Sequence, residues 1–494
     1  MSKKIRTIVI GAVVLLVLAA AVAVLMLLPE KEEDSSSILT PTTSSVSIAD
    51  QSSEQVRSIS VKNREDAYTI ELAGENLWRI QELGDFPANQ SQYNTTRIQV
   101  STLTAIQVVE EHSTRLGDYG LQPAEAEIRV EFQDGTSYEV ALGNISPDGL
   151  RRYARRLDTE TDTVYGLSTT ALSAAYLPRT AYLDTQVTPA FASETGAGIE
   201  LNLLSITGNY MESPIVIQEI EDDDPDKERA MDSVKMTSPV RSLVDSMWMQ
   251  NNVYSFFSLT ADEVVAVSPT DLSVYGLDPA YMTAEMRYEE TSSFRLLVGS
   301  GIDSEGNPAA NPKDIASYYV MREGVDLVYA VPKENLPWVG VKPSQVITSL
   351  VILPNIASVD RVELELEGKK HTLQITQTPN PEEPDDPQKN DFTFTMDGAA
   401  TDEDMSRKFY QLLLSTGIQD VNLTERELSS PSMSITYHML DGTSDRIDFY
   451  VLEDLTTIVS LNGNNAYIGR SGLVDKVGKE LSNLLSGEAV ETDW

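Results

Sequence analysis

Apolar and polar positions alternate with period two over much of the chain, which is the pattern of half-buried β-strands. The first such run begins at residue 56, where Ile59 and Val61 alternate with polar residues, as Tyr68, Ile70 and Leu72 do soon afterwards. Apolar residues at wider spacing then predict a helix. Its apolar face carries Ile98, Val100, Leu103, Ile106 and Val109. These elements open a first predicted α+β unit over residues 56–180.

A motif of the first unit returns later in the chain. Leu-x-x-Tyr-Gly-Leu-x-Pro begins at Leu116 and again at Leu272, and each copy precedes a strand, a polar turn, a second strand and a glycine. The first of these turns contains Asp134-Gly135, a dipeptide typical of β-hairpins. A returning motif indicates repeated structural units. The second unit is predicted over residues 198–340, with its helix in the stretch SPVRSLVDSMWMQNN.

The returning motif is interpreted as a folding corner. Glycine permits a backbone turn that other residues resist, and proline holds the next residues in extended geometry. The tyrosine and leucine anchor the corner in the core, and a ligand site is the alternative interpretation. The residues concerned are Tyr119, Gly120, Leu121, Pro123, Tyr275, Gly276, Leu277 and Pro279.

A third, degenerate unit is predicted over residues 345–490. It opens with the alternating Val362, Leu364 and Leu366, and it lacks Tyr-Gly-Leu. A helix is expected in TDEDMSRKFYQLLLSTG, with Thr401 or Asp402 as N-cap and a glycine at its end. A hairpin over Asp441-Gly442 and a final helix complete the same order of elements.

The amino terminus predicts a membrane anchor. Lys3, Lys4 and Arg6 precede an uncharged run over residues 8–28, which has the length needed to cross a bilayer. The basic flank predicts that residues 1–7 are cytoplasmic and that the bulk of the chain is extracytoplasmic. A cleaved signal peptide is the alternative, although its apolar core is usually shorter. Residues 29–55, rich in Ser, Thr and acidic residues, are predicted to be a flexible stalk.

Composition excludes several classes of function. The formal net charge is -39, and such a surface repels nucleic acid, so we expect no nucleic-acid partner. The chain has no Cys, which excludes disulfides, thiolate metal sites and cysteine nucleophiles. There is no Gly-x-Ser-x-Gly, no phosphate-binding Gly-x-x-x-x-Gly-Lys-Ser/Thr loop and no Gly-x-Gly-x-x-Gly after a strand. We therefore expect neither a cofactor nor a catalytic residue.

Ionisable clusters offer few alternatives to that expectation. His112, His371 and His438 belong to different predicted elements, the first of them the helix, and no two have metal-ligand spacing. The acidic runs at 219–232 and 379–391 lack the spacing of a calcium loop and are interpreted as extended hairpin loops, with a weak cation site as the alternative.

Two further groups are candidates for binding. The basic stretch LRRYARRLD is a possible partner-binding site or an exposed strand whose charges pair with neighbouring acids. Its arginines are Arg151, Arg152, Arg155 and Arg156. The aromatic group in SMWMQNNVYSFF could bind sugars or peptides, but its spacing favours a place in the core. That group comprises Trp248, Tyr254, Phe256 and Phe257.

Taken together, the anchor, LGDYGLQP and LSVYGLDP, the hairpins ending in Leu-Gly or Val-Gly, and the later VYGLS and VYAVP resemble the bacterial DUF4340 family. The resemblance is clearest over residues 57–180 and 199–339. It implies a partner of an ABC-type export system of the gliding-motility kind, with contacts to permease or auxiliary subunits. It implies no catalytic residue.

The expected fold is α+β: an N-terminal transmembrane helix followed by tandem repeats of small antiparallel sheets, each packed with a helix. The expected function is that of a non-catalytic, membrane-tethered binding or scaffold protein, an accessory component of an ABC-type transporter. A cell-envelope hydrolase acting on wall polymers and a receptor for a small solute are the alternatives.

Overall fold

The computed structural model describes residues 45–493 except 75–76, 191–198, 225, 228–229, 231, 290, 381–388 and 425. The predicted cytoplasmic segment 1–7, the predicted transmembrane helix 8–28 and most of the predicted stalk therefore lie outside the described residues. Within the described ranges, no helix combines the length and apolarity that a membrane crossing requires.

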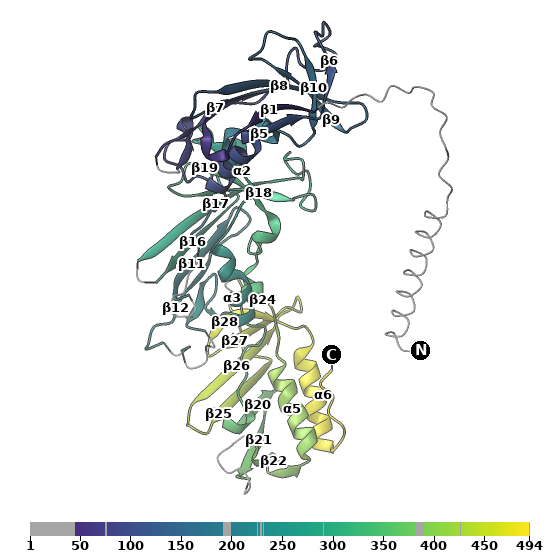
Figure 1. Ribbon diagram of the computed structural model, residues 1–494. Helices are drawn as coiled ribbons and strands as arrows, with labels where there is room; N and C mark the ends of the chain where they lie inside the picture. Colours follow the sequence, from purple (N-terminus) through teal and green to yellow (C-terminus); the bar gives the residue numbers. More distant parts are fainter. Residues whose placement is uncertain are drawn as a thin grey trace, which may run out of the picture.

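Three antiparallel sheets lie one after another along an elongated molecule (Figure 1). The strand orders are β4-β3-β2-β7-β8-β9-β10-β6, β14-β13-β12-β11-β16-β17-β18-β19-β15 and β23-β22-β21-β20-β25-β26-β27-β28-β24. The order is the same in all three, apart from an additional edge strand in the second and third. The prediction of an α+β chain dominated by antiparallel sheets is confirmed. Each sheet with its helices is called a unit below.

Unit 1 contains the first sheet, a separate strand pair and one α-helix. Its strands are β1 (Val46–Asp50), β2 (Val56–Asn63), β3 (Ala67–Leu72), β4 (Trp78–Ile80), β5 (Thr102–Ala105), β6 (Gln107–Glu110), β7 (Ala126–Phe132), β8 (Ser137–Ile145), β9 (Arg151–Arg156) and β10 (Val164–Ser168). Its helix is α2 (Gln90–Ser101), and its 3-10 turns are η1 (Ser53–Gln55), η2 (Gln81–Leu83), η3 (Ser173–Tyr176) and η4 (Arg179–Tyr182).

Unit 2 contains the second sheet and two short α-helices. Its strands are β11 (Leu201–Gly208), β12 (Ile215–Glu219), β13 (Val234–Ser238), β14 (Ser242–Leu243), β15 (Glu263–Val267), β16 (Met282–Tyr288), β17 (Ser292–Ile302), β18 (Ser317–Arg322) and β19 (Leu327–Pro332). Its helices are α3 (Ser246–Asn252) and α4 (Pro343–Val346), and its 3-10 turns are η5 (Val253–Phe256), η6 (Ser273–Tyr275) and η7 (Lys333–Asn335).

Unit 3 contains the third sheet and two α-helices. Its strands are β20 (Val359–Leu366), β21 (Lys369–Thr378), β22 (Asp391–Met396), β23 (Ala399–Thr401), β24 (Ile418–Val421), β25 (Met433–Met439), β26 (Ser444–Val451), β27 (Thr457–Leu461) and β28 (Asn464–Gly469). Its helices are α5 (Glu403–Leu414) and α6 (Leu473–Ser486), and its 3-10 turn is η8 (Ile356–Ser358). Asp402 caps α5 by accepting the Met405 N–H at 3.0 Å, as its sequence predicts.

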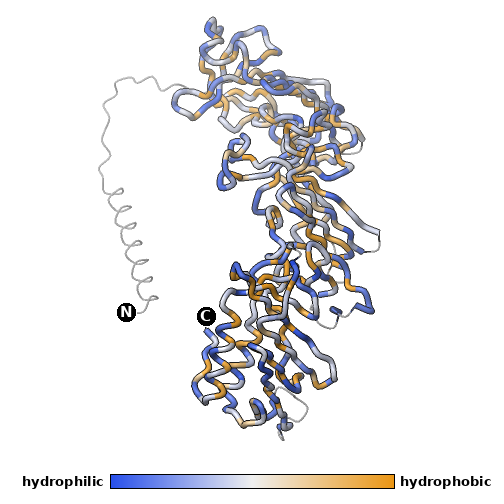
Figure 2. Tube along the Cα trace, turned by 180° about the vertical axis from the view of Figure 1, so that it is seen from behind, coloured by the Kyte–Doolittle hydropathy of each residue, from blue (hydrophilic) through white to orange (hydrophobic). Residues whose placement is uncertain are grey.

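The alternation read from the sequence separates a buried face of each sheet from a polar face. Ile59, Val61, Tyr68 and Ile70 are all buried, whereas the residues between them are not. Apolar and polar positions alternate along the strands and along α5 and α6 (Figure 2). One continuous core runs beneath the three sheets.

The prediction that the helix of unit 1 continues beyond Ser101 is wrong. The helix α2 ends there, and residues 102–110 form β5 and β6 instead. Ile98 is 62 % exposed and Ile106 is 43 % exposed, so neither lies on a buried helical face. The stretch after the helix is dense in β-branched residues, which favour strands. His112 consequently lies in a turn after β6, with φ 51°.

The predicted stalk is also wrong in its last part. Val46–Asp50 form β1, which pairs antiparallel with β5, and Ala49 is buried. Apolar and polar residues alternate in VSIAD, which is the pattern of a β-strand, and pairing with β5 fixes the position of this strand. Residues 29–44 lie outside the described part of the chain.

Linker 1, residues 182–188, joins units 1 and 2 through backbone hydrogen bonds to both. Leu183 bridges to Ala88, just before helix α2 of unit 1, and Gln186 bridges to Thr260, just before β15 of unit 2. The hydrogen bonds are Asn89 N–H to Tyr182 O (2.9 Å), Asp184 N–H to Pro87 O (2.8 Å), Val187 N–H to Leu259 O (2.8 Å) and Ala261 N–H to Thr185 O (2.9 Å).

Linker 2, residues 346–350, joins units 2 and 3 in the same way. Ile347 bridges to Val244, just before α3, and Leu350 bridges to Gly417, just before β24. The hydrogen bonds are Asp245 N–H to Val346 O (2.8 Å), Thr348 N–H to Leu243 O (3.2 Å) and Ile418 N–H to Ser349 O (2.8 Å). Both joints thus use the segments that flank the helix of each unit, with the same spacing between the two bridges.

The last unit ends differently from the first two. Where they have a short turn and a linker, unit 3 has the helix α6, which lies against α5 (Figure 1). The chain after α6 folds back onto it, because Val490 is buried and the Glu491 N–H donates to the buried Glu480 carboxylate at 3.0 Å. The helix α6 and the residues after it therefore pack on unit 3, where units 1 and 2 have a short helical turn and a linker.

Candidate functional site

The Tyr-Gly-Leu corner of unit 1 folds over the polar face of its sheet. Gly120 has φ 67°, and Leu121 is buried in a small second core with Leu116. The Tyr119 ring meets the Tyr153 ring edge-on, with 4.8 Å between centroids. Unit 2 repeats this arrangement, with Gly276 at φ 66° and the rings of Tyr275 and Tyr319 5.2 Å apart.

In each corner, the tyrosine carbonyl oxygen lies close to a glycine of the neighbouring strand. The Asn144 N–H donates to the Tyr119 carbonyl at 2.8 Å, and a Cβ added to Gly143 would lie 2.2 Å from that same oxygen. In unit 2, a Cβ on Gly299 would lie 2.1 Å from the Tyr275 oxygen. The glycine that ends each predicted hairpin is therefore needed for close approach of the corner backbone.

The Tyr119 hydroxyl gives the first corner a polar contact. It donates to Glu110 Oε2 at 2.8 Å, and Ser113 Oγ donates to the same oxygen at 2.8 Å. These hydrogen bonds, that of Tyr119 first, lower the pKa of the Glu110 carboxyl. Pro123 and Pro279 both follow cis peptide bonds. All these contacts lie within the corner, and together they close the loop over the sheet.

The four candidate arginines lie on β9, and each pairs with a carboxylate of its own unit. The pairs are Arg151 with Asp148 (3.5 Å), Arg152 with Glu125 (3.1 Å), Arg155 with Asp162 (2.6 Å) and Arg156 with Asp158 (2.5 Å). Successive side chains of a strand point to opposite faces of the sheet. The four arginine side chains therefore project from both faces. They do not form one basic patch, and their role in partner binding remains a prediction.

Arg152 is the most buried of the four, with 14 % of its side chain exposed. Besides Glu125, its Nη1 donates to the Gly143 carbonyl at 2.9 Å and to the Tyr176 hydroxyl at 2.8 Å. Its guanidinium also lies 4.5 Å from the centre of the Tyr176 ring. Burial raises the pKa of Tyr176 to about 12. Arg152 thus ties η3 to the glycine that supports the corner.

We expect Arg152→Ala to lower the free energy of unfolding by about 1.5–3 kcal/mol, because it leaves Glu125 and the Gly143 carbonyl without this donor. Arg151→Ala is the matched control on the same strand. Its 3.5 Å pair with Asp148 lies at the surface and should change stability by less than about 0.5 kcal/mol. Thermal and denaturant unfolding of the two variants measure the difference, and equal effects would contradict the role given to Arg152.

The polar face of unit 3 carries a second charged cluster, centred on Glu363. Its carboxylate lies 2.7 Å from Lys370 Nζ, 3.4 Å from Arg361 Nε and 3.4 Å from His438 Nε2. The Lys370 ammonium, with His438 and Arg361 contributing less, lowers the pKa of Glu363 from its usual 4.5 to about 2. His371 contacts Asp397 at 2.7 Å in a separate pair. The two histidines thus have different carboxylate partners.

Glu363→Gln should lower the melting temperature at neutral pH, with a difference from wild type that narrows as the pH falls from 4.5 toward 2. The sign follows because a carboxylate with a lowered pKa stabilises the fold above its unfolded pKa and loses that effect as it becomes protonated. Glu365→Gln changes an exposed carboxylate on the same strand and is the control. Calorimetry across this pH range checks the prediction, which a constant difference would contradict.

The acidic run at 219–232 forms the connection between β12 and β13 and is partly neutralised. Lys235, with 7 % of its side chain exposed, contacts the carboxylates of Asp224 and Asp226, and Arg241 contacts both at 2.8 Å. Among the described residues, no group of three or more acidic or histidine side chains is placed to hold a metal ion. Most of the run at 379–391 lies outside the described ranges.

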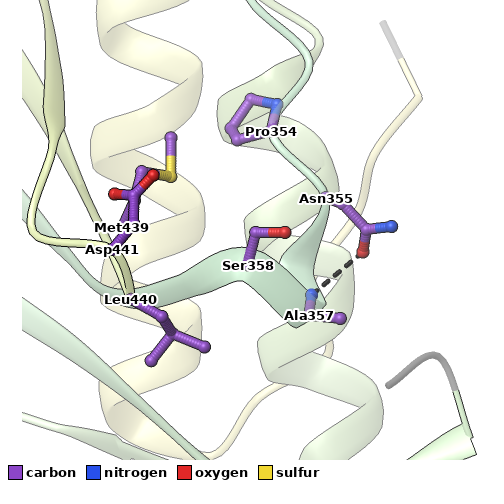
Figure 3. A pocket seen from close by; sticks show the side chains of 7 residues that line it. All are labelled: Pro354, Asn355, Ala357, Ser358, Met439, Leu440 and Asp441. Atoms are coloured by element: carbon purple, nitrogen blue, oxygen red, sulfur yellow. Dashed lines mark hydrogen bonds between the residues drawn. The ribbon is translucent and has the colours of Figure 1, made fainter. Parts of the chain in front are cut away.

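Pockets occur at the surface of units 2 and 3. One of about 460 Å³ lies between η8 and the β25–β26 turn, and it is lined by Pro354, Ser358, Met439 and Asp441 among others (Figure 3). At its rim, the Asn355 side-chain oxygen accepts the Ala357 N–H at 2.9 Å. Another of about 610 Å³ lies beside Asp262, Lys333 and Glu334 in unit 2. Both are open to solvent on one side.

Residues 78–280 match the family model described as "Domain of unknown function (DUF4340)". Over these residues the chain is similar to the DUF4340 family. The resemblance read from the sequence is therefore confirmed over this range. The matched DUF4340 region runs from β4 of unit 1 to the second Tyr-Gly-Leu corner, and unit 3 lies beyond it. Comparison with curated proteins and with solved structures gave no match.

The aromatic group within the DUF4340 match belongs largely to the core. Phe256 and Phe257 are buried, and Phe256 stacks on Trp338 with 4.5 Å between ring centres. Trp248 packs partly buried against the same core, whereas Tyr254 is 48 % exposed. Most of these aromatic side chains therefore pack in the core, which is the place that their spacing in the sequence favours.

The segments that form the joints were missed by the sequence interpretation, although a signal was present. Leu-Thr-Ala occurs at residues 103–105 and again at 259–261, directly after the helical segment of each unit. The second copy receives linker 1, and the first copy is β5. The two copies have the same separation as the two Tyr-Gly-Leu corners, so the repeat is longer than the corner and hairpin alone.

Proposed function

We propose that this chain is a non-catalytic, membrane-tethered scaffold or binding protein outside the cytoplasm, and an accessory component of an ABC-type transporter complex. We further propose that its three units are tandem repeats of one module. The observation that supports this function best is the pair of equivalent joints. Each joint fixes neighbouring units to each other through backbone hydrogen bonds and buried residues.

Joints of this kind favour a spacer or platform. A flexible peptide between units would let them reorient freely, whereas both linkers are paired along their length. Tyr182, Leu183 and Val187 of linker 1 are buried, as are Val346 and Ile347 of linker 2. The surfaces of the units are therefore held in fixed relative positions, which suits a protein that positions partners.

The membrane assignment rests on residues 8–28, and the fold begins soon after them. The strand β1 starts at Val46, so a fully extended chain from Leu28 to Val46 spans at most about 65 Å. With an anchor at residues 8–28, unit 1 would be the membrane-proximal unit. The transporter partner is what the DUF4340 resemblance implies.

Chemical crosslinking of the full-length protein in its native membranes, followed by affinity purification, tests this function. We expect permease or auxiliary subunits of an ABC-type system to be recovered with it. Recovery of wall polymer alone, together with measurable cleavage of that polymer, would favour the hydrolase alternative. Release of the protein from membranes by a high-salt wash would contradict the anchor.

A further inference from the structure

One tyrosine–valine pair recurs between the edge strand and its neighbour in all three sheets. Tyr165 lies opposite Val108 in unit 1, Tyr329 lies opposite Val264 in unit 2, and Tyr467 lies opposite Val421 in unit 3. Each pair joins the last strand of the sheet to the strand that follows the helical segment. We call the surface around this pair the receiving face of a unit.

In units 2 and 3, the preceding unit covers the receiving face. The turn η4 of unit 1 lies against β15, and the helix α4 of unit 2 lies against β24. Val264 and Tyr329 are each 2 % exposed, and Val421 and Tyr467 are 5 % and 4 % exposed. The hydroxyl of Tyr467 also contacts Ser242 Oγ of unit 2 at 3.1 Å. The pair is therefore an anchor of both joints.

In unit 1, no element of the described residues covers the same face as η4 and α4 do in units 2 and 3. Tyr165 and Val108 are only partly buried, and Ile106 beside them is 43 % exposed. The residue equivalent to Ile106 is Asp262, because Ile106 and Asp262 donate equivalent hydrogen bonds to Gly166 O and Ala330 O. Unit 1 thus places an aliphatic side chain in solvent where unit 2 places a carboxylate. The difference increases the apolar area of this face.

The half-joint in unit 1 is otherwise complete. The strand β1 pairs with Leu103–Ala105, as linker 1 pairs with Leu259–Ala261. Within the described residues, β1 pairs with β5 alone. Within the described residues, unit 1 therefore has the incoming strand of a joint without a short helical turn before it.

The receiving faces of units 1 and 2 both have an arginine at the end of the neighbouring strand. Arg322 ends β18, and both Arg322 and Asp184 of linker 1 lie within electrostatic range of the Tyr329 hydroxyl. Arg156 ends β9 and lies within the same range of Tyr165. In unit 2 the incoming segment therefore brings an acidic residue close to an apolar contact. Arg156, singled out in the sequence as a candidate for partner binding, is the equivalent basic residue of unit 1, where it also pairs with Asp158 of its own unit at 2.5 Å.

We propose that the receiving face of unit 1 binds a different protein, through a short apolar helical turn followed by extended residues that include an acid. In units 2 and 3 that segment is η4 or α4 of the same chain, and within the described residues both are already used in the chain's own joints. This proposal deepens the proposed function and rests on it, since it names the surface through which the scaffold would hold its partner.

A photocrosslinking amino acid at position 106 of the full-length chain, in native membranes, tests the proposal. We expect an adduct with another protein, and no such adduct from the same probe at Leu485, which is 49 % exposed on the helix α6. An adduct with lipid, an adduct of twice the chain mass, or no adduct at position 106 would each overturn the proposal.

The variant Ile106→Asp gives a second, independent measurement. The fold accepts aspartate at the equivalent Asp262, so the variant should retain the wild-type melting temperature. Recovery of the partner after chemical crosslinking should fall at least about tenfold, as expected when a buried aliphatic contact is lost. Ile98→Asp, at a 62 % exposed position on α2, is the control and should recover the partner normally.

The two proposals can fail separately. If wild-type protein recovers transporter subunits and Ile106→Asp recovers them equally well, the receiving face is not the binding surface, but the proposed function stands. If wild-type protein recovers no protein partner, the proposed function fails first.

Discussion

Gly143→Ala is expected to lower the free energy of unfolding by about 1–3 kcal/mol, the usual cost of forcing an extra methyl group into a packed site. The new Cβ would lie 2.2 Å from the Tyr119 carbonyl oxygen, which is backbone and also accepts the Asn144 N–H at 2.8 Å. The oxygen cannot move away without breaking that hydrogen bond and displacing the whole corner. Gly299→Ala should have a similar effect, because its Cβ would meet the Tyr275 oxygen at 2.1 Å.

Gly74→Ala is the matched control, because a Cβ there has no atom within 4 Å. Its effect on stability should remain below about 0.5 kcal/mol, as is usual at surface positions. Denaturant unfolding of the three variants measures these differences. If Gly143→Ala and Gly299→Ala were as stable as the control, the corners would not depend on close backbone approach.

Val187→Pro should release unit 1 from its fixed orientation on unit 2. Proline has no N–H, so the 2.8 Å hydrogen bond to the Leu259 carbonyl is lost, and only the longer 3.4 Å contact from Thr188 remains. A lost hydrogen bond costs about 1 kcal/mol, and an unsatisfied buried carbonyl costs about 1–3 kcal/mol. Because Val187 is also buried, we expect the joint to open while both units stay folded.

The absence of cysteine makes this measurement simple, because two introduced cysteines can be labelled specifically. Leu150→Cys in unit 1 and Val274→Cys in unit 2 are both 66 % exposed and carry the labels. The distribution of distances between the labels should be narrow in the parent protein and broad in Val187→Pro. Gln186→Ala, which changes an exposed side chain of the same linker, should keep the narrow distribution. An equally narrow distribution in Val187→Pro would show that the linker pairing does not fix the units.

Local signals in the sequence predicted local structure well. The hairpins over Asp134-Gly135 and Asp441-Gly442 are present, and both glycines have the positive φ that such turns require, 85° and 89°. The N-cap of α5 and the alternation of the strands were readable for the same reason, since each depends on residues close in sequence.

Properties fixed by distant partners were not predictable in the same way. Residues 102–110 have apolar positions that fit a helix or a strand, and it is pairing with β1 and β10 that makes them strands. The arginines of β9 form an evident basic stretch, but the carboxylates that neutralise them come in part from other loops, such as Glu125 for Arg152. The joints consist of backbone hydrogen bonds, which leave little trace in side-chain pattern.

The joints also bear on how such a chain can lengthen. Units 1 and 2 hold their outgoing linkers with the segment before the helix, and units 2 and 3 hold the incoming linkers with the segment after the helix. A stretch of gene encoding one unit with its linker therefore encodes both halves of a contact. Duplicating that stretch would add a further unit whose contact surfaces are already in place.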